Sequence, residues 1–216
     1  MSLRILVVDD HAVVRRGVRS LLESHEGWEV CGEATTGRDA VEQSRRLRPD
    51  VVVMDLSLPE LNGLDATRQI LKAAPDTEVL VLTMHHSEEL ARDVLQAGAR
   101  GYVLKADADE NLIAAVESLR QHKPFLTSTV TEFVLDEYVR RGDGPLDDFA
   151  PAGVTARERE IIQLVAEGRS NKEAASTLGI SVKTIEAHRA NIMRKLHLRS
   201  VSDLVRYAIR NKIVTP

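Results

Sequence analysis

Apolar residues follow two different rhythms over residues 1–122. Short runs of mostly β-branched residues, typical of buried strands, alternate with longer segments whose apolar residues recur at helical spacing. The predicted strands are 3–8, 29–34, 51–54, 78–82 and 101–104, and the predicted helices are 11–24, 37–48, 64–74, a segment ending at 97, and 107–121. Because strand–helix–strand units favour right-handed crossovers, the pattern predicts a five-stranded parallel α/β sheet covered by helices on both faces.

A purely helical pattern replaces this alternation near residue 153. Four helices are predicted, with starts marked by the capping boxes Thr155-x-x-Glu158 and Ser170-x-x-Glu173 and by Ser181 and Ser200. A short turn at Gly179 joins the second helix to the third, which is typical of a helix-turn-helix. Residues 123–152 hold one candidate helix, at 127–141, and many turn-forming residues. The predicted organisation is a domain at 1–122, a partly helical linker at 123–152 and an all-α domain at 153–216.

The third predicted helix of the second domain has an apolar and a polar side. At about 100° per residue, the residues expected to face the core are Val182, Ile185, Ile192, Met193 and Leu196. Residues expected to contact base edges are Lys183, Glu186, Ala187, Ala190 and Arg194. Residues expected to meet phosphates are Thr184, His188, Asn191, Lys195 and, from the preceding helix, Lys172. The pattern alone leaves open the alternative of a solvated face of a helical bundle.

Composition is that of a soluble globular protein, with 43% hydrophobic and 29% charged residues. A single cysteine, Cys31, excludes an intrachain disulfide framework and a cysteine-rich zinc site. No apolar run approaches the roughly 18 residues of a membrane span. The chain enters its first strand without a charged and then apolar leader. We therefore expect a cytoplasmic protein with no membrane partner.

The net charge of −4 is unevenly distributed. Residues 1–151 carry 17 Lys and Arg against 27 Asp and Glu, a net charge of −10. Residues 152–216 carry 12 against 6, a net charge of +6. This asymmetry indicates two domains, of which the basic one is a candidate for binding nucleic acid. Charge alone leaves open the alternative of two ordinary domains with different isoelectric points.

Five polar residues follow carboxyl ends of predicted strands: Asp9, Asp10, Asp55, Thr83 and Lys105. Those ends lie along one edge of a parallel sheet, where open α/β sheets bind their ligands. Crowded carboxylates require a divalent cation, and oxygen ligands favour Mg²⁺. Lys105 and the Thr83 hydroxyl would bind the oxygens of a phosphoryl group that reaches Asp55. Singly, each residue has a plainer explanation as a helix cap or surface lysine; together they predict a phosphoacceptor site.

A set of motifs spans residues 3–121 in a characteristic order. They are Asp9-Asp10, Asp55 with Leu58-Pro59 and Asn62-Gly63, Thr83, and Gly101-Tyr102-Val103-Leu104-Lys105. In order and spacing they resemble the receiver domain of two-component response regulators. The resemblance implies a flavodoxin-like fold with strand order 2-1-3-4-5, in which Asp55 takes a phosphoryl group from the phosphohistidine of a sensor histidine kinase.

The same resemblance implies roles for individual residues around Asp55. Mg²⁺ would be held by Asp10, Asp55 and the backbone carbonyl of Ser57, with Asp9 assisting. Thr83 and Tyr102 resemble the family's switch pair, in which the hydroxyl moves toward the phosphoryl group and the aromatic ring turns inward. The plainer alternative for Tyr102 is a half-buried aromatic residue of a strand.

A second set of motifs covers about residues 153–212. It comprises Thr155-x-Arg157-Glu158, Gly168-x-Ser170-Asn171-Lys172-Glu173-x-Ala175, and Ile180-Ser181-x-x-Thr184-Ile185-x-x-His188-x-x-Asn191-Ile192-x-x-Lys195-Leu196. These motifs resemble the LuxR-type tetrahelical DNA-binding domain, and joined to a receiver they define the NarL/FixJ subfamily. The subfamily implies a dimer in which the last helix, about 200–211, pairs two DNA-binding domains. Glu186 departs from members with a basic residue there; it either accepts a hydrogen bond from cytosine or lowers non-specific affinity.

Three functional hypotheses follow. The leading one is a non-enzymatic transcription regulator that is phosphorylated on Asp55, dimerises, binds double-stranded promoter DNA and acts on the transcription machinery. The second is a phosphohydrolase working through a phosphoaspartate, which needs a general acid where Ser57 stands. The third is a constitutive DNA-binding regulator whose receiver serves only for dimerisation or protein binding.

Overall fold

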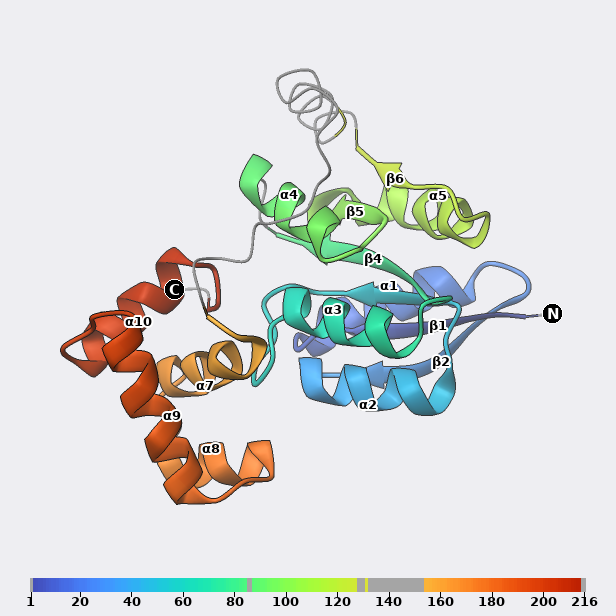
Figure 1. Cartoon of the computed structure of the whole chain (residues 1–216). Coiled ribbons are helices and arrows are strands. Elements are labelled where there is room, and N and C mark those ends of the chain that lie inside the picture. The colour runs from blue at the N-terminus through green and yellow to red at the C-terminus, as the bar shows by residue number, and fades with distance from the viewer. Residues whose placement is uncertain (1, 85–86, 128–130, 132–153, 215–216) are drawn as a thin grey trace. The chain divides into compact units, whose positions relative to one another are not determined.

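The computed structural model of the chain describes residues 2–84, 87–127, 131 and 154–214. The chain separates into two compact units, of which one contains a sheet and the other is helical in its described part (Figure 1). Most of the predicted linker at 123–152, including nearly all of its candidate helix at 127–141, lies outside the described residues. None of the helices that the structure describes has both the length and the apolar character needed to cross a membrane.

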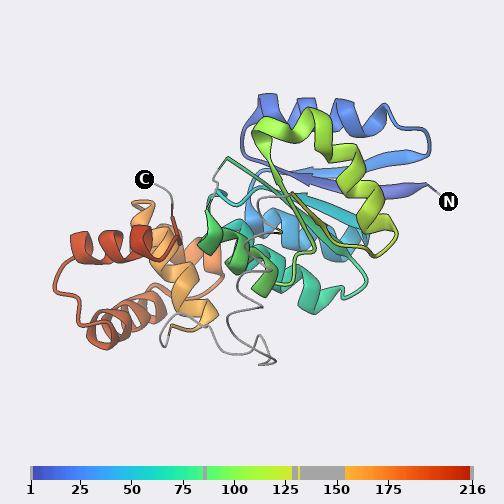
Figure 2. The ribbon, with the colours of Figure 1, turned by 90° about the horizontal axis from the view of Figure 1, so that it is seen from above.

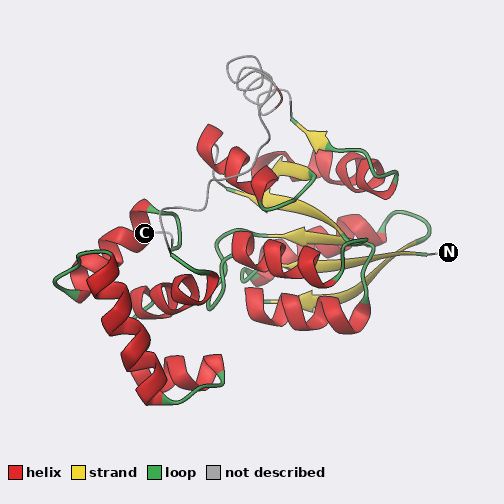
Figure 3. Cartoon of the chain, in the orientation of Figure 1, coloured by secondary structure: helices red, strands yellow, loops and turns green. Residues whose placement is uncertain are grey.

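Six parallel strands form the sheet of the first unit (Figure 3). They are β1 (Leu3–Val8), β2 (Trp28–Ala34), β3 (Val51–Met54), β4 (Glu78–Thr83), β5 (Gly101–Leu104) and β6 (Phe125–Leu126). Their order is β2-β1-β3-β4-β5-β6, so the predicted order 2-1-3-4-5 is confirmed. The sixth strand was not predicted, because two apolar residues are too few to show a strand pattern. It pairs with Gly101 and Tyr102 of β5 and lies in the segment predicted to be linker.

Helices cover both faces of this sheet. They are α1 (Ala12–Glu23), α2 (Gly37–Leu47), α3 (Gly63–Ala73), α4 (Glu88–Gln96) and α5 (Ala108–Arg120), with a 3₁₀ turn, η1 (Lys105–Asp107), after β5. In Figure 2, α1 and α5 lie on one side of the sheet and α2, α3 and α4 on the other. Alternate strand residues such as Ile5, Val53 and Leu82 pack against Leu22 of α1 and Leu119 of α5. Because both faces are buried, the inner strand β3 is apolar and buried along its whole length, whereas the edge strand β2 also carries Glu29 and Glu33.

The described residues of the second unit form the helices α7 (Ala156–Ala166), α8 (Asn171–Leu178), α9 (Val182–Lys195) and α10 (Val201–Arg210). Both predicted capping boxes form, at the starts of α7 and α8. Gly179 ends α8 in the left-handed conformation (φ 63°), which glycine adopts without strain. Ile161, Leu178, Ile185 and Leu204 bring all four helices into one apolar core. The predicted tetrahelical domain is therefore confirmed.

Candidate functional site

The carboxyl ends of β1 and β3 bring two of the predicted acids side by side. Val8 pairs with Met54 in the register of these strands, so the next residues, Asp9 and Asp55, leave the sheet together. The Asp55 backbone N–H extends the ladder by donating to the Val8 carbonyl at 2.9 Å. Only 2% of each aspartate is exposed. Two carboxylates in this position repel one another strongly, because little water is present to screen them.

Lys105, immediately after β5, lies between the two aspartates. Its Nζ is 2.7 Å from Asp9 Oδ2 and 2.9 Å from Asp55 Oδ2, and its side chain is 8% exposed. Burial raises the pKa of Asp55, although the nearby charge of Lys105 opposes this shift. Burial would lower the pKa of Lys105, but the hydrogen bond with Asp9 and the charge of Asp55 outweigh it and raise that pKa. The ammonium therefore stays charged and holds the two acids together.

Asp10 completes a group of carboxylates that we call the acidic cluster (Asp9, Asp10 and Asp55). Ligand atoms from these residues and from His11 all lie within 4.8 Å of one another. Asp9 Oδ2 and Asp55 Oδ2 are both buried and face the Lys105 ammonium. Such an oxygen-rich set is typical of a Mg²⁺-binding pocket. The residues present therefore fit the cation that the sequence predicted.

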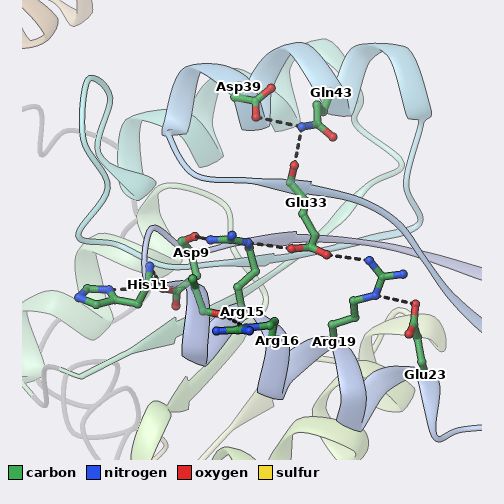
Figure 4. Close-up of polar contacts among 10 residues, drawn as sticks. Asp9, His11, Arg15, Arg16, Arg19, Glu23, Glu33, Asp39 and Gln43 are labelled. Atoms are coloured by element: carbon green, nitrogen blue, oxygen red, sulfur yellow. Dashed lines mark hydrogen bonds and ion pairs between the residues drawn. The ribbon is translucent and has the colours of Figure 1, made fainter.

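His11 belongs to this site although the sequence analysis did not select it. Its Nδ1 lies 2.7 Å from Asp10 Oδ1, and its backbone N–H donates to Asp9 Oδ1 at 2.8 Å. The side chain is 66% exposed and stands just before α1 (Figure 4). Its adjacency to two aspartates was the signal available in the sequence, but a strand-end pattern selects only the residues that directly follow the strand.

The turn after β3 fixes the Asp55 carboxylate from its other side. Asp55 Oδ1 accepts a hydrogen bond from the Leu56 N–H at 2.8 Å, and the Ser57 backbone N–H also bonds with this carboxylate. The Gly63 N–H, at the start of α3, donates to the Leu56 carbonyl at 3.0 Å. A Cβ on Gly63 would lie 2.0 Å from the Asp55 carbonyl oxygen. The glycine of the Asn62-Gly63 motif is therefore required by close backbone approach, which its place in a motif did not reveal.

Thr83 and Tyr102 are both buried in the neighbouring strands. Thr83 is 0% exposed at the end of β4 and pairs with Leu104, the residue before Lys105. Tyr102 is 1% exposed in β5 and pairs with Val81 of β4. Burial raises the pKa of Tyr102 to about 12. The aromatic ring is thus buried rather than half-buried, and the switch role of the pair stays a prediction.

In the helical unit, α9 presents the predicted outer face to solvent. The exposed residues of the predicted DNA-contact set are Lys183, Thr184, Glu186, Ala187, Ala190, Asn191, Arg194, Lys195 and, on α8, Lys172; His188 is half-buried. The prediction that Val182 faces the core is wrong. Val182 is 39% exposed, because it occupies the first position of α9, before the helix meets the other helices. Ile185 and Ile192, by contrast, are fully buried.

Two contacts hold α9 against its neighbours. Lys195 Nζ lies 2.7 Å from Glu158 Oε2, and Glu158 also closes the capping box of α7. The Arg189 guanidinium donates to the Asn171 side chain at the start of α8. Arg189 was not selected from the sequence, because at about 100° per residue it falls on the apolar side of the helical wheel, between Leu196 and Met193. These contacts link α9 to α7 and α8 beside the apolar core that the helices share.

Comparisons with known proteins agree with this architecture. Residues 5–117 match the response regulator receiver domain, and residues 152–208 match the luxR family of bacterial regulatory proteins. The chain is 39% identical over 218 residues to the oxygen regulatory protein NreC of Staphylococcus epidermidis, which covers 98% of this chain and 99% of NreC. The chain belongs to the NarL/FixJ subfamily of response regulators.

Solved structures of other response regulators resemble the chain as well. A LuxR-family response regulator from Aurantimonas is 35% identical over 64% of this chain and 99% of its own, with a TM-score of 0.61. A structure of two RcsB dimers bound to two parallel DNAs is 27% identical over 96% of this chain and 98% of its own, with a TM-score of 0.58. The response regulator is accordingly a DNA-binding transcription regulator and not an enzyme, which decides against the phosphohydrolase hypothesis. Its receiver domain implies a kinase partner.

Proposed function

We propose that this response regulator accepts a phosphoryl group on Asp55 from the phosphohistidine of a sensor histidine kinase and then binds promoter DNA as a dimer. The observation that carries the proposal is the position of Lys105, whose ammonium lies within 2.9 Å of Asp55 and 2.7 Å of Asp9. A buried acid held between a cation and further carboxylates is the arrangement expected of a phosphoacceptor.

Each residue of the acidic cluster has a distinct part in the transfer. Asp10, Asp55 and the Ser57 backbone carbonyl would hold Mg²⁺, with Asp9 assisting, and the bound ion would neutralise charge on the phosphoryl oxygens. A carboxylate oxygen of Asp55 forms the new bond to phosphorus while the phosphorus–nitrogen bond breaks and the imidazole leaves. Lys105 then pairs with the phosphoryl oxygens, to which the Thr83 hydroxyl also donates. Tyr102, which is 1% exposed in this structure, would already occupy the inward position that accompanies movement of Thr83.

The helical unit supplies the DNA-binding part of the proposal. Lys183, Glu186 and Arg194 would contact base edges from the exposed face of α9, while Lys172 and His188 would meet phosphates. Further candidates for base-edge contacts are Ala187 and Ala190. Further candidates for phosphate contacts are Thr184, Asn191 and Lys195. Two such helices on a dimer would reach half-sites about one DNA turn apart.

An exposed apolar stripe on α10 supports dimerisation through this helix. Val201 and Ile209 are 48% and 37% exposed, and the half-buried Val205 lies between them at four-residue spacing. Residues four apart lie on one helix face, so the three side chains form a continuous apolar strip. RcsB, whose dimers bind DNA, offers a precedent for the assembly. A cytoplasmic location, contact with the transcription machinery and domain boundaries at 122 and 153 belong to the same proposal.

Acyl-phosphate labelling of the full chain tests the phosphoacceptor assignment. Phosphoramidate and Mg²⁺ should produce one hydroxylamine-sensitive phosphoprotein, resolved by phosphate-affinity electrophoresis. The Asp55→Asn variant, which keeps the shape of the side chain and removes its nucleophile, should give none. Asp65→Asn is a matched control, because Asp65 is an aspartate of the same unit that is 6% exposed and paired with Arg68 on α3. Undiminished labelling of Asp55→Asn would refute the assignment.

A further inference from the structure

A chain of charged contacts begins at the backbone of Asp9 and leads away from the acidic cluster (Figure 4). Arg15, in the first turns of α1, donates from Nη1 to the Asp9 carbonyl oxygen at 2.8 Å. Its Nε donates to Glu33 Oε2 on β2 at 2.7 Å. The Arg15 side chain is 17% exposed, so solvent screens these bonds only in part. One guanidinium thus joins three elements: the end of β1, helix α1 and the edge strand β2.

A second arginine fixes the other oxygen of Glu33. Arg19, one helical turn after Arg15, places Nη1 2.7 Å from Glu33 Oε1 and Nε 2.9 Å from Glu23 Oε1. The hydrogen bond from Arg19, supported by that from Arg15, holds the pKa of Glu33 below its ordinary value although partial burial opposes it. Glu33 therefore stays ionised, with each of its oxygens directed at a different arginine.

The backbone of Glu33 is anchored from α2 as well. Gln43 Nε2 donates to the Glu33 carbonyl at 2.6 Å and to Asp39 Oδ2 at 2.9 Å. The residue that directs Arg15 is thus held by the helices on both faces of the sheet, and its own position is well determined.

We propose that Arg15 is a positioning residue for the metal-binding end of β1, with Glu33 as the group that orients it. The inference rests on the proposed function, since it concerns the same acidic cluster. Arg15 touches neither the metal ligands' carboxylates nor a phosphoryl group. Arg15 instead holds the Asp9 carbonyl and thereby orients the peptide between Asp9 and Asp10. In this orientation the carboxylates of Asp9 and Asp10 both lie next to that of Asp55.

Two physical effects of removing Arg15 have opposite signs, which makes the proposal testable. Loss of a positive charge near three carboxylates would tighten cation binding. Loss of the bond to the Asp9 carbonyl would free the 9–10 peptide and weaken cation binding, because groups that orient metal ligands commonly contribute about tenfold or more to metal affinity. If Arg15 acts by positioning the 9–10 peptide, the second effect is larger, and removal of Arg15 weakens cation binding.

Arg15→Gln and Arg19→Gln form a matched pair. Each removes one arginine of α1 and one ion pair with Glu33, but only Arg15 contacts Asp9. Arg15→Lys keeps the charge and loses the fork that reaches Glu33 and the Asp9 carbonyl together. In the full chain, the Mg²⁺ concentration that half-saturates the thermal stabilisation of each variant is measured. The Mg²⁺ concentration for half-maximal phosphoramidate labelling is measured in parallel.

We expect both Arg15 variants to raise the two Mg²⁺ midpoints by about tenfold, and Arg19→Gln to change them less than about twofold. The labelling rate at saturating Mg²⁺ should change less than the midpoint, which separates positioning from a general loss of structure. Equal midpoints for Arg15→Gln and Arg19→Gln, or tighter Mg²⁺ binding by Arg15→Gln, would overturn the inference. Failure of Arg15→Gln to fold leaves Arg15→Lys to decide it. Absence of any Mg²⁺ effect or labelling in the wild-type chain would instead refute the proposed function, and this inference with it.

Discussion

The acidic cluster of the sheet unit and the outer face of α9 both carry charged residues, but the first holds its charges largely in buried contacts and the second exposes them to solvent. Asp9, Asp55 and the Lys105 side chain are almost fully buried, and the Lys105 ammonium lies 2.7 Å from Asp9 and 2.9 Å from Asp55. Lys183 and Arg194 are exposed on the surface of their helix. Charges in the first group interact strongly with a few fixed partners, whereas charges in the second act weakly and over distance.

The difference separates two kinds of chemistry. The buried part of the cluster, Asp9 and Asp55 with Lys105, is sensitive to small displacements and largely insensitive to salt, which suits a site that must admit one small group in one orientation. An exposed basic face tolerates small displacements and depends on ionic strength, which suits contact with a polyanion. Perturbations that act on burial should therefore affect one unit, and perturbations that act on screening should affect the other.

Salt should produce the largest contrast. If about six phosphates are neutralised, DNA affinity should fall about a thousandfold between 50 and 200 mM salt. Phosphoramidate labelling of Asp55 should change by less than about threefold over the same range, because its charges are buried. Fluorescence anisotropy with a genomic fragment and phosphate-affinity electrophoresis measure the two responses. If the labelling rate were as sensitive to salt as DNA binding, the claim that the charges around Asp55 are shielded from solvent would be contradicted.

Removal of one lysine from each region should have very different effects on stability. Lys105→Met leaves Asp9 and Asp55 buried without their cation, and we expect a loss of about 3 kcal/mol in the free energy of unfolding without Mg²⁺. Lys183→Met removes an exposed charge and should change it by less than about 0.5 kcal/mol. Urea denaturation at neutral pH measures both. Similar losses for the two variants would show that Lys105 is not a structural counter-ion.

Substitution of two glycines compares a position next to Asp55 with one that has open space around it. Gly63→Ala would place a Cβ 2.0 Å from the Asp55 carbonyl, which requires movement of the main chain and should cost about 2–3 kcal/mol. It should also slow labelling. Gly17→Ala is the control, since a Cβ there meets nothing within 4 Å, and it should stabilise α1 by about 0.5–1 kcal/mol. Normal labelling by a stably folded Gly63→Ala chain would show that the close approach does not matter.

Burial of Tyr102 predicts the smallest effect, which is confined to alkaline pH. Its pKa is raised by burial from 10.0 to about 12, so the unfolded chain releases the proton before the folded chain does. The stability that Tyr102 contributes is present below pH 10 and is lost as pH rises toward 12. Ultraviolet titration of Tyr102→Phe against wild type should remove an ionisation step near pH 12. Loss of a step near pH 10 instead would mean that the ring is exposed.

The fold was predictable from the sequence to the extent that it depends on apolar periodicity. Strand runs such as 51–54 and capping boxes such as 155–158 are local signals, and both formed as expected. The two-residue strand β6 was missed, because its pairing with β5 is a tertiary contact that leaves no periodic pattern. Val182 was misplaced, since a helical wheel does not show where a helix leaves the core.

The candidate site was predictable to the extent that its residues directly follow the predicted strands. Asp9, Asp55 and Lys105 were selected because parallel strands end along one edge, and that rule needs no side-chain geometry. His11 and Arg15 were missed, because their contacts depend on rotamers and on the register between β1 and β2. Sequence patterns select residues at strand ends more readily than residues whose contacts depend on tertiary geometry.

The central claim is that phosphorylation of Asp55 controls DNA binding, and it is tested most directly by measuring DNA affinity with and without phosphoramidate. A genomic fragment selected by the phosphorylated protein serves as ligand, at fixed salt, for wild type and Asp55→Asn. The account predicts that phosphodonor raises wild-type affinity by about tenfold or more, within the usual range of allosteric coupling, and leaves Asp55→Asn unchanged. Equal wild-type affinity with and without phosphodonor, despite full labelling, would contradict it and favour the constitutive DNA-binding regulator.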